Sequence, residues 1–128
     1  MSHWVWVRLA VVLAVHDRAL AAYGGSEGIR DLGVLEGALG RPQNLAAYEE
    51  PDIADLAALY AAGIAKAHAF VDGNKRTAWT IARTFLELNG HGLACEKAEA
   101  VLVMERVAND LVDATALAEW FRCRLRRR

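Results

Sequence analysis

Nine consecutive residues, from His68 to Arg76, hold side chains that could carry out one chemical reaction together. Histidine is the side chain that most readily exchanges a proton near neutral pH. Asp72 follows His68 by four residues and offers hard oxygen ligands of the kind that bind Mg²⁺ beside phosphates. Lys75 and Arg76 add two cations, and arginine can bind phosphate oxygens through two parallel hydrogen bonds. A base, a metal ligand and a phosphate grip predict transfer of a phosphate-containing group onto a hydroxyl.

The stretch lies between two segments with helical spacing, so its loop is expected to connect two helices. Gly73 allows a tight turn and the close approach of a ligand, because it has no Cβ. The first N–H groups of a helix that begins at about Asn74 have no helical acceptor, and with the helix dipole they form an anion site. Lys75 and Arg76 at this helix start oppose the dipole, at a cost of about 0.3–1 kcal/mol each when exposed. A bound polyphosphate would compensate for that cost.

Each of these residues also has an ordinary structural explanation. A histidine on an apolar helix face is usually a core residue with a satisfied hydrogen bond. Asp72-Gly73-Asn74 alone is a common turn and helix cap, and Lys75 and Arg76 alone are surface charges. Four such coincidences within nine residues favour an active site over four separate structural roles.

Helical spacing of apolar residues dominates the rest of the chain and predicts an all-α single domain over residues 1–128, a compact bundle of about six helices. The expected helices cover residues 9–23, a short helix from Asp31 to about Leu39, residues 53–67, residues 74–88, a segment around 101–108, and a sixth that follows Asp113 and includes Leu125.

Some expectations concern the ends of these helices. Gly40 and Pro42 are expected to end the second helix, which leaves residues 41–51 irregular. His68 follows Ile64 by four residues and is therefore expected on the inward side of the third helix. Only Trp4–Val7 shows a trace of the alternation that is typical of a strand.

Composition excludes several classes of protein. The formal net charge of −1 gives no global basic field, so nucleic acid is not an expected partner, and the arginine-rich tail (residues 122–128) is interpreted as a solvated helix end. Cys95 and Cys123 form no CxxC pair, which argues against a zinc site or a disulfide framework and fits a reducing cytoplasm. No apolar run approaches the roughly 20 residues of a membrane span, and the residues before Val11 lack a basic signal-peptide start. A soluble cytoplasmic protein with no membrane partner is expected.

The central motif His68-x-Phe70-x-Asp72-Gly73-Asn74-Lys75-Arg76 resembles the Fic signature, in the variant typical of death-on-curing (Doc) toxins. The resemblance extends over most of residues 13–92. It includes the blocks His16-Asp17, Tyr23-Gly24-Gly25, Gly28-Ile29-Arg30-Asp31, Leu35-Glu36, Arg41-Pro42-Gln43-Asn44 and Phe85-Leu86-x-Leu88-Asn89-Gly90.

The resemblance implies a Fic fold of about six helices and a toxin of a bacterial or phage toxin–antitoxin pair. Doc-type toxins are Mg²⁺- and ATP-dependent protein kinases that phosphorylate a threonine of elongation factor Tu and arrest translation. By this resemblance His68 is the catalytic base, Asp72 holds Mg²⁺, and Phe70 packs inward to fix the loop. The nucleotide phosphates would be bound by Gly73, Asn74, Lys75 and Arg76.

Two residues distinguish this chain from typical Fic proteins, which transfer AMP. The typical motif has glycine at the position of Lys75 and a second arginine at the position of Trp79. Both differences favour the Doc pattern, in which the nucleotide lies reversed and the terminal phosphate is transferred. AMP transfer onto a protein hydroxyl and a non-catalytic Fic-fold binding module are the alternatives.

The resemblance also implies a small antitoxin whose C-terminal segment covers the site. The Gly24–Arg30 and Asn44–Pro51 segments are expected to read the protein target, because loops beside a rigid site often carry recognition. His16 is expected to be structural, with a contact that supports the site as the less favoured alternative. Three further residues, His3, Arg83 and His91, are expected on the surface.

Overall fold

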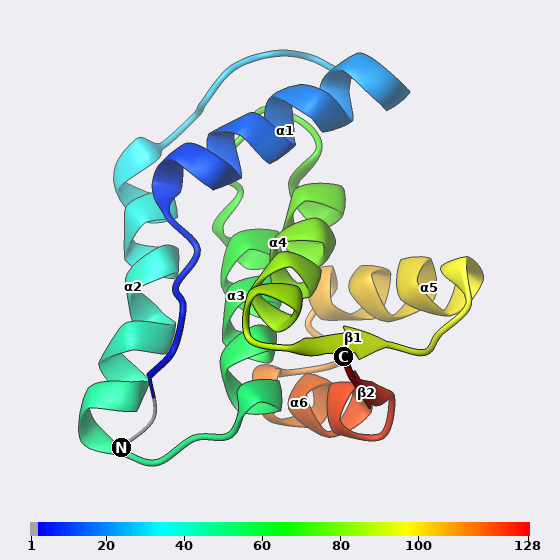
Figure 1. The fold of residues 1–128 in the computed structure, drawn as a ribbon. Coiled ribbons are helices and arrows are strands. Elements are labelled where there is room, and N and C mark those ends of the chain that lie inside the picture. The colour runs from blue at the N-terminus through cyan, green and yellow to red at the C-terminus, as the bar shows by residue number, and fades with distance from the viewer. Residues whose placement is uncertain (1–2) are drawn as a thin grey trace.

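The computed structural model describes residues 3–128 and confirms the expected bundle of about six helices, with a small antiparallel sheet added (Figure 1). The elements are α1 (Leu9–Tyr23), α2 (Leu32–Tyr48), α3 (Ile53–Ala67), α4 (Asn74–Leu88), β1 (His91–Leu93), α5 (Lys97–Ala108), α6 (Ala114–Arg122) and β2 (Leu125–Arg127). Within this described part of the chain, no helix is both long and apolar enough to cross a membrane.

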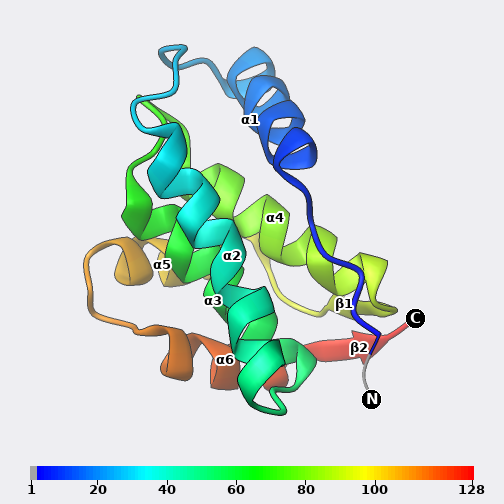
Figure 2. The ribbon, with the colours of Figure 1, turned by 90° about the vertical axis from the view of Figure 1, so that its left-hand side faces the viewer.

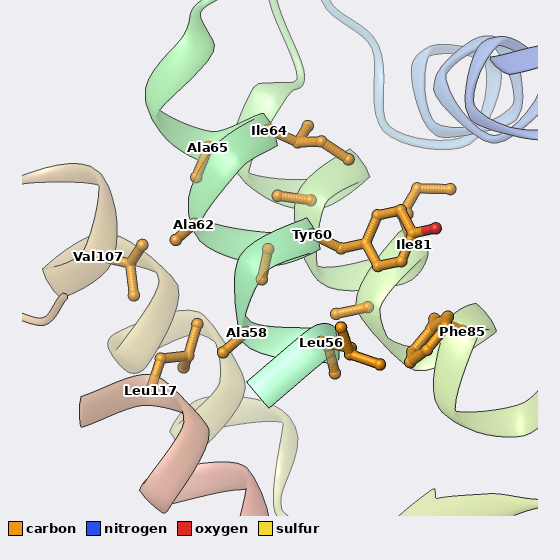
Figure 3. Close-up of a cluster of buried hydrophobic side chains, with 14 of the residues drawn as sticks. Leu56, Ala58, Tyr60, Ala62, Ile64, Ala65, Ile81, Phe85, Val107 and Leu117 are labelled. Carbon is orange, nitrogen blue, oxygen red and sulfur yellow. The ribbon is translucent and has the colours of Figure 1, made fainter. Parts of the chain in front are cut away.

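Helix α3 forms the centre of the bundle and is surrounded by α2, α4, α5 and α6 (Figure 1). It is rich in alanine, and its side chains are buried all around its circumference, as expected of a helix with no polar face. Figure 3 shows its larger side chains directed toward α4 and its alanines toward α5 and α6. The labelled residues of this core are Leu56, Ala58, Tyr60, Ala62, Ile64, Ala65, Ile81, Phe85, Val107 and Leu117.

Helix α2 continues through residue 48, so the prediction that residues 41–51 are irregular is wrong for residues 41–48, and only residues 49–51 lie outside a helix. Pro42 lies inside the helix and cannot donate a hydrogen bond to the carbonyl of Ala38. The loss is tolerated because Pro42 belongs to a buried face that packs against α3. Gly63 of α3 permits this close packing, since a Cβ at Gly63 would lie 3.3 Å from the Cβ of Ala38. Burial of a helix face here outweighs a local helix-breaking signal.

The N-terminal segment, residues 4–7, is extended but pairs with no strand of the described chain, so the suspected strand alternation does not mark a sheet. Side chains satisfy its backbone instead. The N–H of Val5 donates to Asn89 Oδ1 at 2.9 Å, and Asn89 Nδ2 donates to the carbonyl of Val5 at 3.0 Å. The N–H of Val7 donates to the Tyr60 hydroxyl at 3.0 Å. The segment is thereby fixed to α3 and to the end of α4.

Helix α6 ends at residue 122, so the prediction that Leu125 lies in this helix is wrong. Leu125 instead begins β2, which pairs antiparallel with β1 in the register Leu93↔Leu125 and His91↔Arg127. Part of the arginine-rich tail is therefore a strand, not a solvated helix end. Figure 2 shows this ribbon near the marked C-terminus, at the opposite end of α4 from the loop that leads out of α3.

Arg122 ties the end of α6 to the start of α3. Its guanidinium donates to both carboxylate oxygens of Asp52, at 2.8 and 3.1 Å, and to Asp55 at 3.0 Å. Asp52 and Asp55 form the capping box of α3, in which each side chain accepts from the other's backbone N–H. The hydrogen bonds from Arg122 hold the pKa of Asp52 below its ordinary value.

Replacing Arg122 with alanine should lower the free energy of unfolding by about 1 kcal/mol at pH 7. This value is at the upper end of the range for partly exposed ion pairs, because the contact of Arg122 with Asp52 is bidentate. The folded-state pKa of Asp52 lies below its unfolded value of about 3.9. This carboxylate therefore contributes stability above pH ~4, and the contribution is lost as pH falls through the lower folded pKa. Urea unfolding from pH 7 to about pH 2.5 should show a flatter acid limb in the variant.

Arg83→Ala is the matched control for this measurement. Arg83 is an exposed arginine whose contact with Glu87, four residues later on the same helix, is 3.8 Å long. Its removal should change the free energy of unfolding by less than about 0.5 kcal/mol and should leave the acid limb unchanged. Equal losses for the two arginines would contradict a special role for Arg122.

Candidate active site

The loop from His68 to Gly73 connects α3 to α4 and carries the predicted catalytic residues. His68 is the C-cap of α3 and adopts a left-handed backbone conformation, with φ 50° and ψ 38°. Its side chain is exposed, so the prediction that His68 lies on the inward side is wrong. The left-handed residue interrupts the helical periodicity, and Ala69 and Phe70 are buried in its place. His68 therefore faces solvent, where a protein substrate could reach it.

Asn74 fixes this loop through its side-chain amide. The N–H of Phe70 donates to Asn74 Oδ1 at 3.1 Å, and Asn74 Nδ2 donates to the carbonyl of Phe70 at 2.9 Å. Phe70 is buried, as expected from the sequence. The side-chain amide of Asn74 is thus occupied by the loop backbone. The group of Asn74 that remains available to bind an anion is its backbone N–H.

Replacing Asn74 with alanine should lower the free energy of unfolding by about 1–3 kcal/mol, because two backbone groups of a buried residue lose their partners. Activity should fall further than stability alone explains, since the loop that carries His68 loses its clamp. Asn44→Ala is the control: Asn44 is exposed on α2, and alanine there should be neutral or slightly stabilising. Thermal unfolding of both variants and phosphate transfer by Asn74→Ala test this, and equal losses of stability for the two variants would contradict the clamp.

His16 of α1 contacts the same loop. Its Nε2 lies 2.8 Å from the carbonyl oxygen of Asp72, which can only accept, so Nε2 is the donor. Its ring stacks on Phe70 with centroids 3.7 Å apart and planes 10° from parallel. Only 3% of the residue is exposed. His16 is thus buried, in agreement with its expected structural role, and it also makes the contact with the loop that was the less favoured alternative. No spacing rule could connect residues 56 positions apart.

Asp72 places an exposed carboxylate at the mouth of the loop. Its Oδ1 accepts from the N–H of Gly73 at 2.9 Å, and its Oδ2 accepts from the N–H of Ser26 at 3.2 Å. A carboxylate has about four acceptor sites, so each oxygen retains one. Among residues 3–128, no cluster of three or more His, Cys, Asp or Glu side chains could hold a metal by itself. The geometry fits Mg²⁺ bound by Asp72 together with phosphate oxygens and water.

The start of α4 provides the predicted anion site. Gly73 caps the helix with φ 80°, a conformation that favours glycine, and the N–H of Thr77 makes the first helical bond, to the carbonyl of Gly73 at 3.0 Å. The N–H groups of the three preceding residues point out of the helix end. Lys75 and Arg76 are exposed, and no carboxylate of the described residues pairs with either cation.

Tyr23 is a contact that sequence analysis did not assign. Its ring lies beneath Arg76, with the guanidinium carbon 3.6 Å from the ring centroid. The only signal was its place in the Tyr23-Gly24-Gly25 block of the resemblance. Trp79, in contrast, packs against α6, with its ring centroid 6.0 Å from those of Trp120 and Phe121. Trp79 therefore belongs to the bundle packing and cannot serve as a phosphate ligand.

The segment between α1 and α2 forms a second wall of the site. It pairs with the catalytic loop like a short strand: the N–H of Arg30 donates to the carbonyl of Ala69 at 2.6 Å, and the N–H of Val71 donates to the carbonyl of Gly28 at 3.1 Å. Of the two segments expected to read a target, Gly24–Arg30 therefore adjoins the site. Most of the other belongs to α2.

A groove of about 800 Å³ lies between α1 and this segment. Its lining combines apolar side chains with polar groups, among them two acidic residues. The lining residues are Leu13, His16, Asp17, Leu20, Ala21, Gly25, Glu27, Gly28, Ile29 and Phe70. The groove reaches the buried side of the catalytic loop through His16 and Phe70.

Comparison with known protein families identifies the fold. A family model described as the Fic/DOC family matches residues 6–86, which include α1, α2, α3, the catalytic loop and most of α4. The chain belongs to the Fic/DOC family. The resemblance inferred from the central motif is thus confirmed, and the helical bundle agrees with the fold that the resemblance implied.

Two curated members of the family are similar to this chain. A protein named Toxin Doc from Mycolicibacterium smegmatis is 47% identical over 79 residues, which cover 59% of each chain. A protein named Protein kinase doc from Escherichia phage P1 is 42% identical over 80 residues, which cover 62% of this chain and 64% of that protein. The chain thus matches about three fifths of the length of these relatives.

Proposed function

We propose that this chain is the toxin of a toxin–antitoxin pair and acts as a protein kinase that uses ATP and Mg²⁺. The observation that carries the proposal is the meeting of two helix ends: His68 at the C-terminal end of α3, and the free N–H groups of α4 beside Lys75 and Arg76. The printed names of the two relatives, a toxin and a protein kinase, support the same reading.

The proposed reaction transfers the terminal phosphate. A hydroxyl oxygen of the protein target attacks the γ-phosphorus of ATP, the bond from that phosphorus to the β,γ-bridging oxygen breaks, and ADP leaves. His68 accepts the hydroxyl proton, and the imidazolium that forms lies at the helix end that favours positive charge. Lys75, Arg76 and the first N–H groups of α4 hold the phosphate oxygens. Asp72 would hold Mg²⁺, which neutralises phosphate charge.

Two residues favour this reaction over AMP transfer. Lys75 adds a cation where the AMP-transfer pattern has glycine, and Trp79 packs on α6 where that pattern has a second arginine. Moving a cation moves the position at which a phosphate is most stable, and the base assists attack on whichever phosphorus is in line. A threonine of elongation factor Tu is the proposed target, through the family resemblance.

Parallel labelling with α- and γ-labelled ATP tests the proposal. The purified chain with Mg²⁺ should label elongation factor Tu from γ-labelled ATP and leave it unlabelled with α-labelled ATP. Label from the α position would overturn phosphate transfer in favour of AMP transfer. Absence of both labels, with growth arrest that persists in His68→Ala, would overturn catalysis in favour of a binding module.

We further propose that a segment of the antitoxin binds in the groove between α1 and the Gly24–Arg30 segment and thereby inhibits the active site. The groove's apolar side chains and its acidic Asp17 and Glu27 suit an amphipathic segment with a basic rim. Leu13→Glu, in the partly buried wall of the groove, should leave growth arrest intact but abolish rescue by a coexpressed antitoxin. Rescue that is equal to that of the wild type would place the antitoxin elsewhere.

A further inference from the structure

One face of α1 lies against the catalytic loop and the start of α4. His16, Leu20 and Tyr23 follow the i, i+4, i+7 spacing of a single helix face. His16 holds the Asp72 carbonyl, and Leu20 lies close to Gly73, where an added Cβ would meet its side chain at 3.7 Å. Tyr23, at the last position of the helix, lies under Arg76. Helix α1 contributes no residue of the central motif, yet it contacts both parts of the proposed phosphate site.

The Tyr23 contact leaves the hydrogen-bonding edge of Arg76 free. A guanidinium is planar, with its five N–H groups in the plane. The guanidinium carbon lies over the Tyr23 ring, 3.6 Å from its centroid, a distance that is too short for an edge-on approach. The structure shows no side-chain hydrogen bond or ion pair from Arg76 within residues 3–128. Stacking therefore restricts a long, flexible side chain without using the donors that a phosphate needs.

The same ring is approached by a second cation. Lys97, the first residue of α5, has its Nζ 6.0 Å from the Tyr23 centroid. Tyr23 itself is 61% exposed, so its position is not explained by burial in the core. An exposed aromatic ring at the meeting point of two cations from different helices is suited to ordering positive charge around an anion.

We propose that Tyr23 is a positioning residue that holds Arg76 ready to bind a polyphosphate, an inference that rests on the proposed function of the site. Tyr23 acts through Arg76 and does not touch the ligand. It follows that the aromatic ring is required and its hydroxyl is not.

Binding of Mg-ATP and of inorganic tripolyphosphate to the purified chain, measured by calorimetry, tests the inference. Tyr23→Leu should weaken both ligands by about three- to tenfold, and Tyr23→Phe should stay within about twofold of the wild type. In an Arg76→Ala background, Tyr23→Leu should have no further effect. Tyr48→Leu, the same change at an 88% exposed tyrosine at the end of α2, is the matched control and should have no effect.

A ligand-free readout accompanies the binding data. Side-chain NMR signals of Arg76 should show a ring-current shift that Tyr23→Leu removes and Tyr23→Phe retains. Absence of that shift in the wild type, failure to bind tripolyphosphate, or an equal Tyr23→Leu effect with and without Arg76 would overturn the inference. If Tyr23→Leu weakens tripolyphosphate binding as expected but the chain transfers no phosphate from ATP, the inference is supported and the proposed kinase function is overturned.

Discussion

His68→Ala is expected to reduce phosphate transfer to the protein target by about 10²–10⁴-fold, the usual contribution of a general base. In the proposed reaction His68 accepts the hydroxyl proton, and its exposed position at the end of α3 leaves it open to a protein substrate. The fold should persist, because the side chain makes no buried contact in the described structure. Initial rates of γ-phosphate transfer, together with circular dichroism, measure both effects.

His68→Gly separates the loss of the base from a change in the loop. The left-handed backbone of His68 is strained for any residue with a Cβ, so glycine should be more stable than alanine there by roughly 1 kcal/mol. Both variants should be equally inactive, although one is more stable than the other. A loss of transfer of less than tenfold in either variant would remove His68 from the role of base.

Phe85→Ala should lower the free energy of unfolding by about 3–5 kcal/mol, a large fraction of the stability of a domain of this size. Phe85 is fully buried on α4, with ring centroids 5.1 Å from Tyr60, 5.9 Å from Trp6 and 6.1 Å from Trp4. Alanine would leave a cavity between the central helix α3 and the N-terminal segment. Urea unfolding followed by tryptophan fluorescence measures the loss.

Leu88→Ala is the control for this core substitution. Leu88 lies on the same helix but is 48% exposed, so its truncation should cost less than about 1 kcal/mol. Near-ultraviolet circular dichroism should also change in Phe85→Ala, because two tryptophans lose their packing partner. Equal stability losses for the two variants would show that the aromatic cluster is not the centre of the packing.

Sequence patterns predicted the central helices well, because their signals are local. The capping aspartate at position 52, the apolar stripe of α3 and the glycine at position 73 each act within a few residues, and the structure places them as expected. Pro42 misled the prediction because its local cost is outweighed by burial against α3, which no short window contains. The strands β1 and β2 have three residues each, too few for an alternation to be recognised.

The motif of the candidate site could be predicted from the sequence, but the residues of α1 that contact the motif could not. The residue types from His68 to Arg76 lie together in the sequence, and the match to the Fic/DOC family confirms the resemblance that was drawn from them. The chemical roles of these residues stay predictions. The contacts of His16 with Asp72 and of Tyr23 with Arg76 join α1 to residues more than fifty positions away. Such contacts depend on how helices pack, and the spacing of residues within short segments does not reveal it.

The packing of Trp79 has a consequence for how this family could change its chemistry during evolution. By the family resemblance, AMP transfer calls for an arginine at this position. Here the position is held by an indole that contacts Trp120 and Phe121 of α6. An arginine would leave that contact unfilled, so Trp79→Arg alone should lower the stability of the bundle. By the family resemblance, a chain of this fold would need compensating changes in α6 to carry the second arginine without that loss.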